Sequence, residues 1–218
     1  MVALDSFRKR RVCRQNIVKL LLKTNGYVFI KEQYLNNGFT NEIYNVKISR
    51  NFLNLPLNMD WKEIKNLLNL ESHPEGGYYK ETYRDDSTVR LDNGDARSAG
   101  TAIYYMLTEN EKSHFHRVKS DEIWFFHQGE PLEIYIIDSE GELQVELLGN
   151  CLSEGERPQV RVDRNMWFAA KIKEDKGFSL VSCTVSPGFE FKDFELAKKQ
   201  DLLNQYPHLK NEIEILSI

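Results

Sequence analysis

Cysteine is scarce in this 218-residue sequence, and long apolar segments are missing. The three cysteines, Cys13, Cys151 and Cys183, are odd in number and widely spaced, which fits neither a disulfide framework nor a paired zinc motif. We therefore expect a reducing compartment, the cytoplasm. No apolar run approaches the roughly 18 residues that cross a bilayer, so we expect no membrane partner.

Motifs of several large enzyme classes are missing as well. The sequence has no phosphate-binding glycine loop and no serine nucleophile elbow. The net charge is -4, but residues 6–23 are strongly basic and the remainder is acidic, which argues against nucleic acid as the main partner. The basic stretch is either a solvated tail or helix, or a mitochondrial presequence, although Asp5 and the scarcity of serine count against the latter.

The length predicts one main domain, residues 59–218, preceded by an N-terminal extension of unknown role, residues 1–58. The extension mixes short β-prone runs with Asn and Gly and has no sustained period, so we assign it no structure. A short amphipathic helix begins near Asp60, because Asp60 and Glu63 form a capping-box pattern. Its apolar face contains Trp61, Ile64, Leu67 and Leu68.

Most of the main domain reads as β-structure. Short β-branched or aromatic runs alternate with Gly, Asn, Asp and Pro, a pattern typical of an antiparallel sandwich or barrel. A terminal helix, capped by Asp193, is expected to end at Pro207. The predicted strands are residues 78–84, 100–107, 122–129, 132–138, 143–149, 158–163, 166–172 and 178–185.

A His-x-His pair is the first candidate site. His114 and His116 lie two residues apart, so on a regular strand both side chains point to the same face. With Glu122 from the next strand they would form a two-His, one-carboxylate metal site. Glu122 shares its strand face with Trp124, an apolar neighbour. The alternative is that both histidines are simply satisfied side chains of a packed strand pair.

The segment "SHFHRVKSDEIWFFHQGEPLEIYIID" resembles the first motif of the cupin superfamily: His-x-His, a spacer, Glu122, six residues and Gly129. Together with "HPEGGYYKETYR" and "VSCTVSPGFEFKDFELA", it is similar to the fifth cupin family, long labelled a domain of unknown function. The resemblance covers residues 59–207. It implies a mainly β fold, a double-stranded β-helix or jelly-roll barrel with flanking short helices, a small-molecule pocket in the barrel mouth, and a homodimer.

Two departures from the cupin pattern bear on a metal. The spacer between His116 and Glu122 has five residues instead of three or four, so Asp121 is an alternative carboxylate. In the second motif, Phe168 stands where the last histidine ligand would be, and a phenyl ring cannot bind a metal. We expect no cofactor, and keep as an alternative a divalent metal bound by His114, His116 and Glu122.

Without a metal, the same residues suit acid–base chemistry. His116 beside Glu122 or Asp121 can act as a base, and Tyr104 or Lys119 as the opposing proton donor. Periodicity does not decide whether Tyr104 or Tyr105 faces inward. In residue types this set resembles the dTDP-4-dehydrorhamnose 3,5-epimerase branch of the fold.

We therefore expect a small-molecule-binding cupin, an isomerase or epimerase acting on a sugar or sugar-nucleotide-like metabolite. A metal-dependent cupin enzyme and a non-catalytic binding protein are the alternatives. His73 is interpreted as a turn residue. The catalytic candidates are His116, Glu122 and Tyr104, and the ligand-binding candidates are His114, Lys119, Asp121, Tyr78, Arg84 and Trp124.

Overall fold

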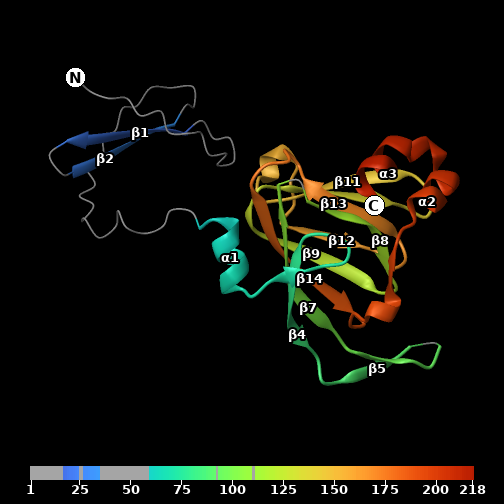
Figure 1. Cartoon of the computed structure of the whole chain (residues 1–218). Coiled ribbons are helices and arrows are strands. Elements are labelled where there is room, and N and C mark those ends of the chain that lie inside the picture. Colours follow the sequence, from blue (N-terminus) through green and yellow to red (C-terminus); the bar gives the residue numbers. More distant parts are fainter. Residues whose placement is uncertain (1–16, 25–26, 35–58, 92, 110) are drawn as a thin grey trace. The chain divides into compact units, whose positions relative to one another are not determined.

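The structure is a computed structural model that describes residues 17–24, 27–34, 59–91, 93–109 and 111–218 (Figure 1). The chain divides into two units, Met1–Met59 and Asp60–Ile218. In the first unit, β1 (Ile17–Thr24) and β2 (Tyr27–Tyr34) pair as antiparallel strands. Residues 17–24 are therefore a strand and not the tail or helix that their basic charge suggested. Cys13 and the presequence question lie outside the described residues.

The second unit is a barrel of two antiparallel sheets, which confirms the predicted jelly-roll class (Figure 1). The five-stranded sheet has the order β11-β10-β13-β8-β15, and the six-stranded sheet has the order β12-β9-β14-β7-β4-β3. All eight predicted runs are strands. The strands are β3 (Glu71–Ser72), β4 (Tyr78–Arg84), β5 (Thr88–Arg90), β6 (Ala96–Ser98), β7 (Thr101–Thr108), β8 (Lys112–Val118), β9 (Asp121–Gly129), β10 (Leu132–Ile137), β11 (Leu143–Leu148), β12 (Gln159–Val162), β13 (Trp167–Ile172), β14 (Phe178–Ser186) and β15 (Phe194–Leu196).

The core lies between the two sheets and is built from alternate residues of each strand. In β10, Leu132 and Ile134 point inward, and in β13 Phe168 and Ala170 do so. They meet inward residues of the six-stranded sheet, among them Trp124. Burial of each large apolar side chain contributes about 1.5–3 kcal/mol, so the period-two pattern fixes which face of each strand closes the barrel.

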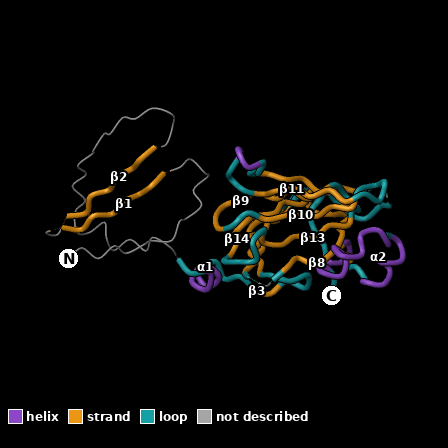
Figure 2. The backbone as a smooth tube through the Cα atoms, turned by 90° about the horizontal axis from the view of Figure 1, so that it is seen from above, coloured by secondary structure: helices purple, strands orange, loops and turns teal. Residues whose placement is uncertain are grey.

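Short helices cover both sides of the barrel (Figure 2). α1 (Trp61–Leu67) has the predicted capping box, in which the Asp60 N–H donates to Glu63 at 3.1 Å. Ile64 is buried, but Leu67 is exposed, because the helix ends at that residue. On the other side, α2 (Lys199–Gln205) and α3 (Lys210–Leu216) pack their apolar residues on β8 and β13. None of the described helices is long and apolar enough to span a membrane.

The predicted start of the terminal helix is wrong. Residues 191–193 form a single 3-10 turn, β15 then pairs with β8, and the helix begins only at Lys199. Asp193 does not cap a helix because its carboxylate is buried and accepts two bonds from Arg97, at 2.5 and 3.0 Å. Lys119 lies 3.4 Å from the same carboxylate. The buried bidentate ion pair between Arg97 and Asp193 thus fixes residues 191–193, which follow the last long strand of the barrel, against β6.

Asp193→Ala is expected to lower the midpoint of thermal unfolding by several degrees, because it leaves the buried Arg97 guanidinium without its main partner. The matched control is Glu195→Ala, which removes the exposed partner of Arg117 and should change the midpoint little. Differential scanning calorimetry compares the two variants. Equal midpoints would contradict a structural role for the Arg97 pair.

Candidate functional site

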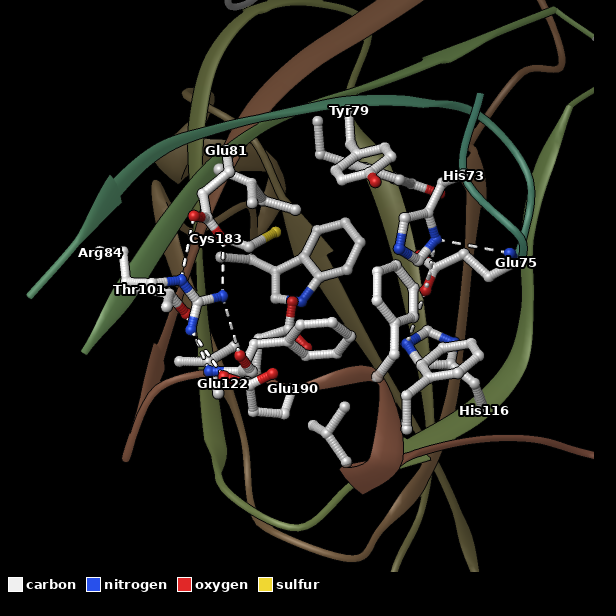
Figure 3. Close-up of a pocket in the computed structure, with 18 residues that line it drawn as sticks. His73, Glu75, Tyr79, Glu81, Arg84, Thr101, His116, Glu122, Cys183 and Glu190 are labelled. Carbon is white, nitrogen blue, oxygen red and sulfur yellow. Dashed lines mark hydrogen bonds and ion pairs between the residues drawn. The ribbon is translucent and has the colours of Figure 1, made fainter. Parts of the chain in front are cut away.

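A cavity of about 150 Å³ opens into the barrel between the two sheets (Figure 3). Its polar lining comes from the loop before β4, from β4, β7, β8, β9 and β14, and from the segment after β14: His73, Glu75, Tyr79, Glu81, Arg84, Thr101, Tyr105, His116, Glu122, Cys183 and Glu190. Its apolar lining is Ile103, Val118, Trp124, Val185, Phe189, Phe191 and Phe194. Of the predicted site residues, His116, Glu122, Arg84 and Trp124 lie here.

The two histidines of the His-x-His motif do not share a face. Along β8, His116 is opposite Phe168 and Ser113 is opposite Ala170, so three steps on β8 match two on β13. This β-bulge resets the alternation of side chains between Ser113 and His116. Ser113 and His116 both reach the carboxylate of Glu75, whereas His114 Nδ1 lies 2.7 Å from the backbone oxygen of Glu75, outside the cavity lining. His114 is therefore corrected from a ligand-binding residue to one that supports the adjacent loop.

His116 and Glu75 form a buried pair. The Nδ1 of His116 lies 2.8 Å from the carbonyl oxygen of His114, which can only accept, so Nδ1 carries the proton. Nε2 lies 3.2 Å from Glu75 Oε2. Burial lowers the pKa of His116, and the Glu75 carboxylate opposes that shift. An unprotonated Nε2 has only a lone pair to offer the carboxylate, so this contact becomes a hydrogen bond when Nε2 takes up a proton.

Glu75 is ionised although it is buried. Burial alone would raise its pKa, but His116, His73 and the Ser113 hydroxyl together outweigh burial and lower the pKa to about 2. Ser113 Oγ donates to Oε1 at 2.8 Å, and His73 Nδ1 lies 3.3 Å from Oε2. The carboxylate that partners His116 is therefore Glu75, and neither Glu122 nor Asp121 as predicted. His73 is a cavity residue as well as part of a turn.

The loop that carries Glu75 depends on two glycines. Gly76 has φ +113°, and a Cβ there would lie 2.0 Å from the backbone oxygen of Lys112. Gly77 has φ +69°, and its Cβ would meet the Tyr105 hydroxyl at 2.9 Å. Only glycine lets this loop close against β7 and β8, where the His114 N–H donates to Glu75 O and the Tyr105 hydroxyl to Gly76 O. The "HPEGG" segment was the available sequence signal for this part of the site.

Glu122 is the second buried carboxyl, and its environment is the opposite of that of Glu75. Burial, with a further contribution from the negative charge of Glu75, raises the pKa of Glu122 to about 8. The thiol of Cys183 hydrogen-bonds to Glu122 and moderates the shift; the pKa of that thiol is itself raised by burial and by Glu122. Glu122 is therefore a neutral acid at pH 7, able to donate a proton.

A second bulge brings Arg84 into the cavity. On β4, Glu81 is opposite Ile103 and Tyr83 is opposite Ala102, so Thr82 is an extra residue. Arg84 consequently lines the same cavity as Glu81, although the two residues are three apart on the strand. Its guanidinium donates to Glu81 at 3.1 and 2.8 Å, to Glu190 at 2.9 Å and to a backbone oxygen at 3.1 Å.

Four other predicted residues lie outside the cavity. Tyr104 faces His127 on the outer side of β7, with ring centroids 6.3 Å apart, and Tyr105 occupies the inward position. Tyr78 stacks on Trp61. Lys119 pairs with Asp193, and Asp121 binds Arg164. The regular alternation of β7 could not by itself distinguish the two tyrosines.

The residues present do not fit a metal centre. Within the described part of the chain, no three His, Cys, Asp or Glu side chains are grouped to hold an ion. His114 is turned away by the bulge, and the Phe168 ring packs 4.0 Å from the His116 ring at the position of the missing fourth ligand. The imidazoles of His73 and His116 are both directed at one oxygen of Glu75 instead of at a shared empty point.

Comparison with known proteins explains the combination of fold and pocket. The profile of a family described as Cupin superfamily (DUF985) matches residues 62–197. The chain belongs to this cupin family. An uncharacterised protein of Saccharomyces cerevisiae is 30% identical to this cupin over 159 residues, covering 66% of this chain and 75% of the yeast protein.

Two solved structures resemble this cupin over most of their own length. A protein from Shewanella oneidensis is 42% identical with a TM-score of 0.69, covering 74% of this chain and 99% of that one. A hypothetical protein from Leishmania major is 34% identical with a TM-score of 0.70, covering 73% and 99%. Membership of the cupin family supports a small-molecule-binding protein, and the descriptions of these relatives assign no reaction.

Replacing each of the two buried carboxyls by an amide should change the free energy of unfolding in opposite directions. Because the pKa of Glu122 is raised, its contribution is favourable below pH about 4.5 and is lost as the pH rises towards about 8. The change in the free energy of unfolding caused by Glu122→Gln should therefore be more favourable at pH 8 than at pH 4.5. The pKa of Glu75 is lowered, so its contribution is present above pH about 4.5 and lost as the pH falls towards about 2, and Glu75→Gln should destabilise at neutral pH. Urea unfolding across this pH range measures both effects, and the same sign for both variants would contradict the assignment.

Gly76→Ala should destabilise the fold far more than Gly94→Ala. Both glycines have positive φ, which costs an alanine about 1 kcal/mol or more, but a Cβ at Gly94 meets nothing within 4 Å. The Gly76 variant must additionally displace the loop from Lys112. Denaturant unfolding of the two variants isolates the packing effect from the backbone effect, and similar losses would argue against the close approach.

Proposed function

We propose that this cupin is an acid–base isomerase or epimerase acting on a small, sugar-like carbonyl compound. The observation that carries the proposal is the pair of buried glutamates that line one cavity, Glu75 ionised and Glu122 neutral at pH 7. Because the pKa values of the two groups are driven apart by their surroundings, Glu122 can supply a proton at a pH at which the ionised Glu75 supports His116 as the base.

His116 acts as the base. Its Nδ1 is occupied by the carbonyl of His114, so Nε2 holds the lone pair that accepts a proton. A proton removed from the carbon next to the substrate carbonyl would then lie on Nε2, 3.2 Å from Glu75. The negative charge of Glu75 stabilises the imidazolium that results.

Glu122 acts as the acid. It retains its proton up to pH about 8, so it can hydrogen-bond to the substrate carbonyl oxygen and stabilise the negative charge that develops there. An isomer forms when His116 returns the proton to the former carbonyl carbon, while Glu122 protonates the carbonyl oxygen and takes up the proton of the neighbouring hydroxyl. An epimer forms when the original carbon instead receives a proton from solvent on its opposite face. The aromatic walls, Trp124 and Phe194 among them, exclude water and strengthen both interactions.

Solvent exchange tests this mechanism. In deuterium oxide, proton NMR of a panel of aldoses and ketoses, free and as sugar nucleotides, should show loss of the signal next to the carbonyl. His116→Gln and Glu122→Gln should each slow the exchange by about 10²–10⁴-fold, the usual range for loss of a general acid or base. The wild-type rate should fall above pH about 8, and that limb of the profile should be absent in Glu122→Gln.

Glu195→Gln is the matched control, because it removes an exposed carboxylate outside the cavity. An unchanged rate of deuterium exchange into the sugar in His116→Gln would refute the role of His116 as the base. Saturable binding with no exchange of any compound would instead indicate a metabolite-binding protein.

A further inference from the structure

The charge balance of the cavity is unusual for a site that would hold a phosphorylated metabolite. Among the described residues that line it, the carboxyls of Glu75, Glu81, Glu122 and Glu190 face a single Lys or Arg side chain, Arg84. Figure 3 shows Glu75 with His73 and His116 on one side of the cavity, and Arg84 with Glu81 and Glu190 on the other. An incoming anion thus meets carboxylates on both sides.

Most of the donor capacity of Arg84 is already used. Four hydrogen bonds occupy its guanidinium: two to Glu81, one to Glu190 and one to the backbone oxygen of Phe189. Two carboxylates therefore neutralise one guanidinium and leave the rim with an excess negative charge. Moving a phosphate next to Glu81 and Glu190 would be opposed by like-charge repulsion.

The interior offers a hydrogen-bond donor for an uncharged ligand oxygen. The indole nitrogen of Trp124 is buried, and it has no hydrogen-bond partner within the described part of the chain. A buried donor without an acceptor is destabilising, so a ligand oxygen that accepts from it removes that cost. Aromatic rings of Tyr79, Phe191 and Phe194 add flat apolar walls to the same cavity.

We propose that the cavity selects an uncharged, hydroxylated ring of about monosaccharide size and rejects its phosphorylated or nucleotide-linked forms. A cavity of about 150 Å³ suits one ring, since an apolar cavity of about this volume holds a benzene molecule. The ligand accepts a hydrogen bond from Trp124 and donates from its hydroxyls to Glu81 and Glu190 at the rim. This inference rests on the proposed function and narrows its substrate class.

Calorimetric titration of paired sugars tests the selection directly. The probes are D-fructose, D-tagatose, D-glucose and D-mannose, each beside its 6-phosphate. At least one free sugar should bind the wild-type protein at least about tenfold more tightly than its phosphate. In ¹⁵N-labelled protein the indole signal of Trp124, assigned with Trp124→Phe, should shift on sugar binding, whereas that of Trp61 on α1 should not.

The double variant Glu81→Gln with Glu190→Gln removes both rim charges and frees Arg84. Its affinity for the sugar phosphates should rise by at least about tenfold, so the preference for the free sugar over its 6-phosphate becomes smaller or reverses. The control, Glu140→Gln with Glu195→Gln, makes the same change in net charge on exposed residues outside the cavity and should leave the preference unaltered.

The outcomes separate this inference from the proposed reaction. Phosphates that bind the wild type as tightly as the free sugars, or no binding of any free sugar, would overturn the charge selection. Sugars that bind with the expected preference but exchange no proton would leave the selection standing and refute the isomerase mechanism.

Discussion

The ionised carboxylate of Glu75 is the interaction on which the site depends. A buried charge is tolerated only where hydrogen bonds and opposite charges surround it, and Glu75 has Ser113, His116 and His73 around its two oxygens. These partners tie the loop before β4 to β8. The same carboxylate faces Nε2 of His116, and its negative charge adds to burial in raising the pKa of Glu122. Burial and the charge of this one carboxylate together determine the pKa shifts of His116 and Glu122, which both line the cavity.

Backbone geometry makes this arrangement possible. Glu75 reaches β8 only because Gly76 and Gly77 adopt positive φ and bring the loop within contact of Lys112 and Tyr105. A bulge in β8 then turns His116 towards Glu75, and a bulge in β4 turns Arg84 towards Glu81. Bulges next to functional sites commonly redirect a side chain in this way.

These irregularities also explain what the sequence could and could not predict. Glu122 and Trp124 both line the cavity, as the regular alternation of β9 predicted, and the eight strand runs followed from their composition. His114 was placed on the same face as His116 because a single extra residue, which no regular alternation reveals, reverses every side chain beyond it. Glu75 was missed because its partnership with His116 is made by the folding of a loop onto a distant strand, which no local period encodes. Asp193 was mistaken for a helix cap because its partner, Arg97, is equally distant.

The most direct test of the account is a titration of the glutamate carboxyl carbons by ¹³C NMR in protein labelled at those positions. The account predicts one carboxyl that titrates with a pKa of about 8 and is absent in Glu122→Gln, and one that stays ionised until pH about 2 and is absent in Glu75→Gln. If every glutamate carboxyl instead titrates between pH about 3.5 and 5, the ordinary range for exposed carboxyls, the two groups are not separated and the acid–base site does not exist as described.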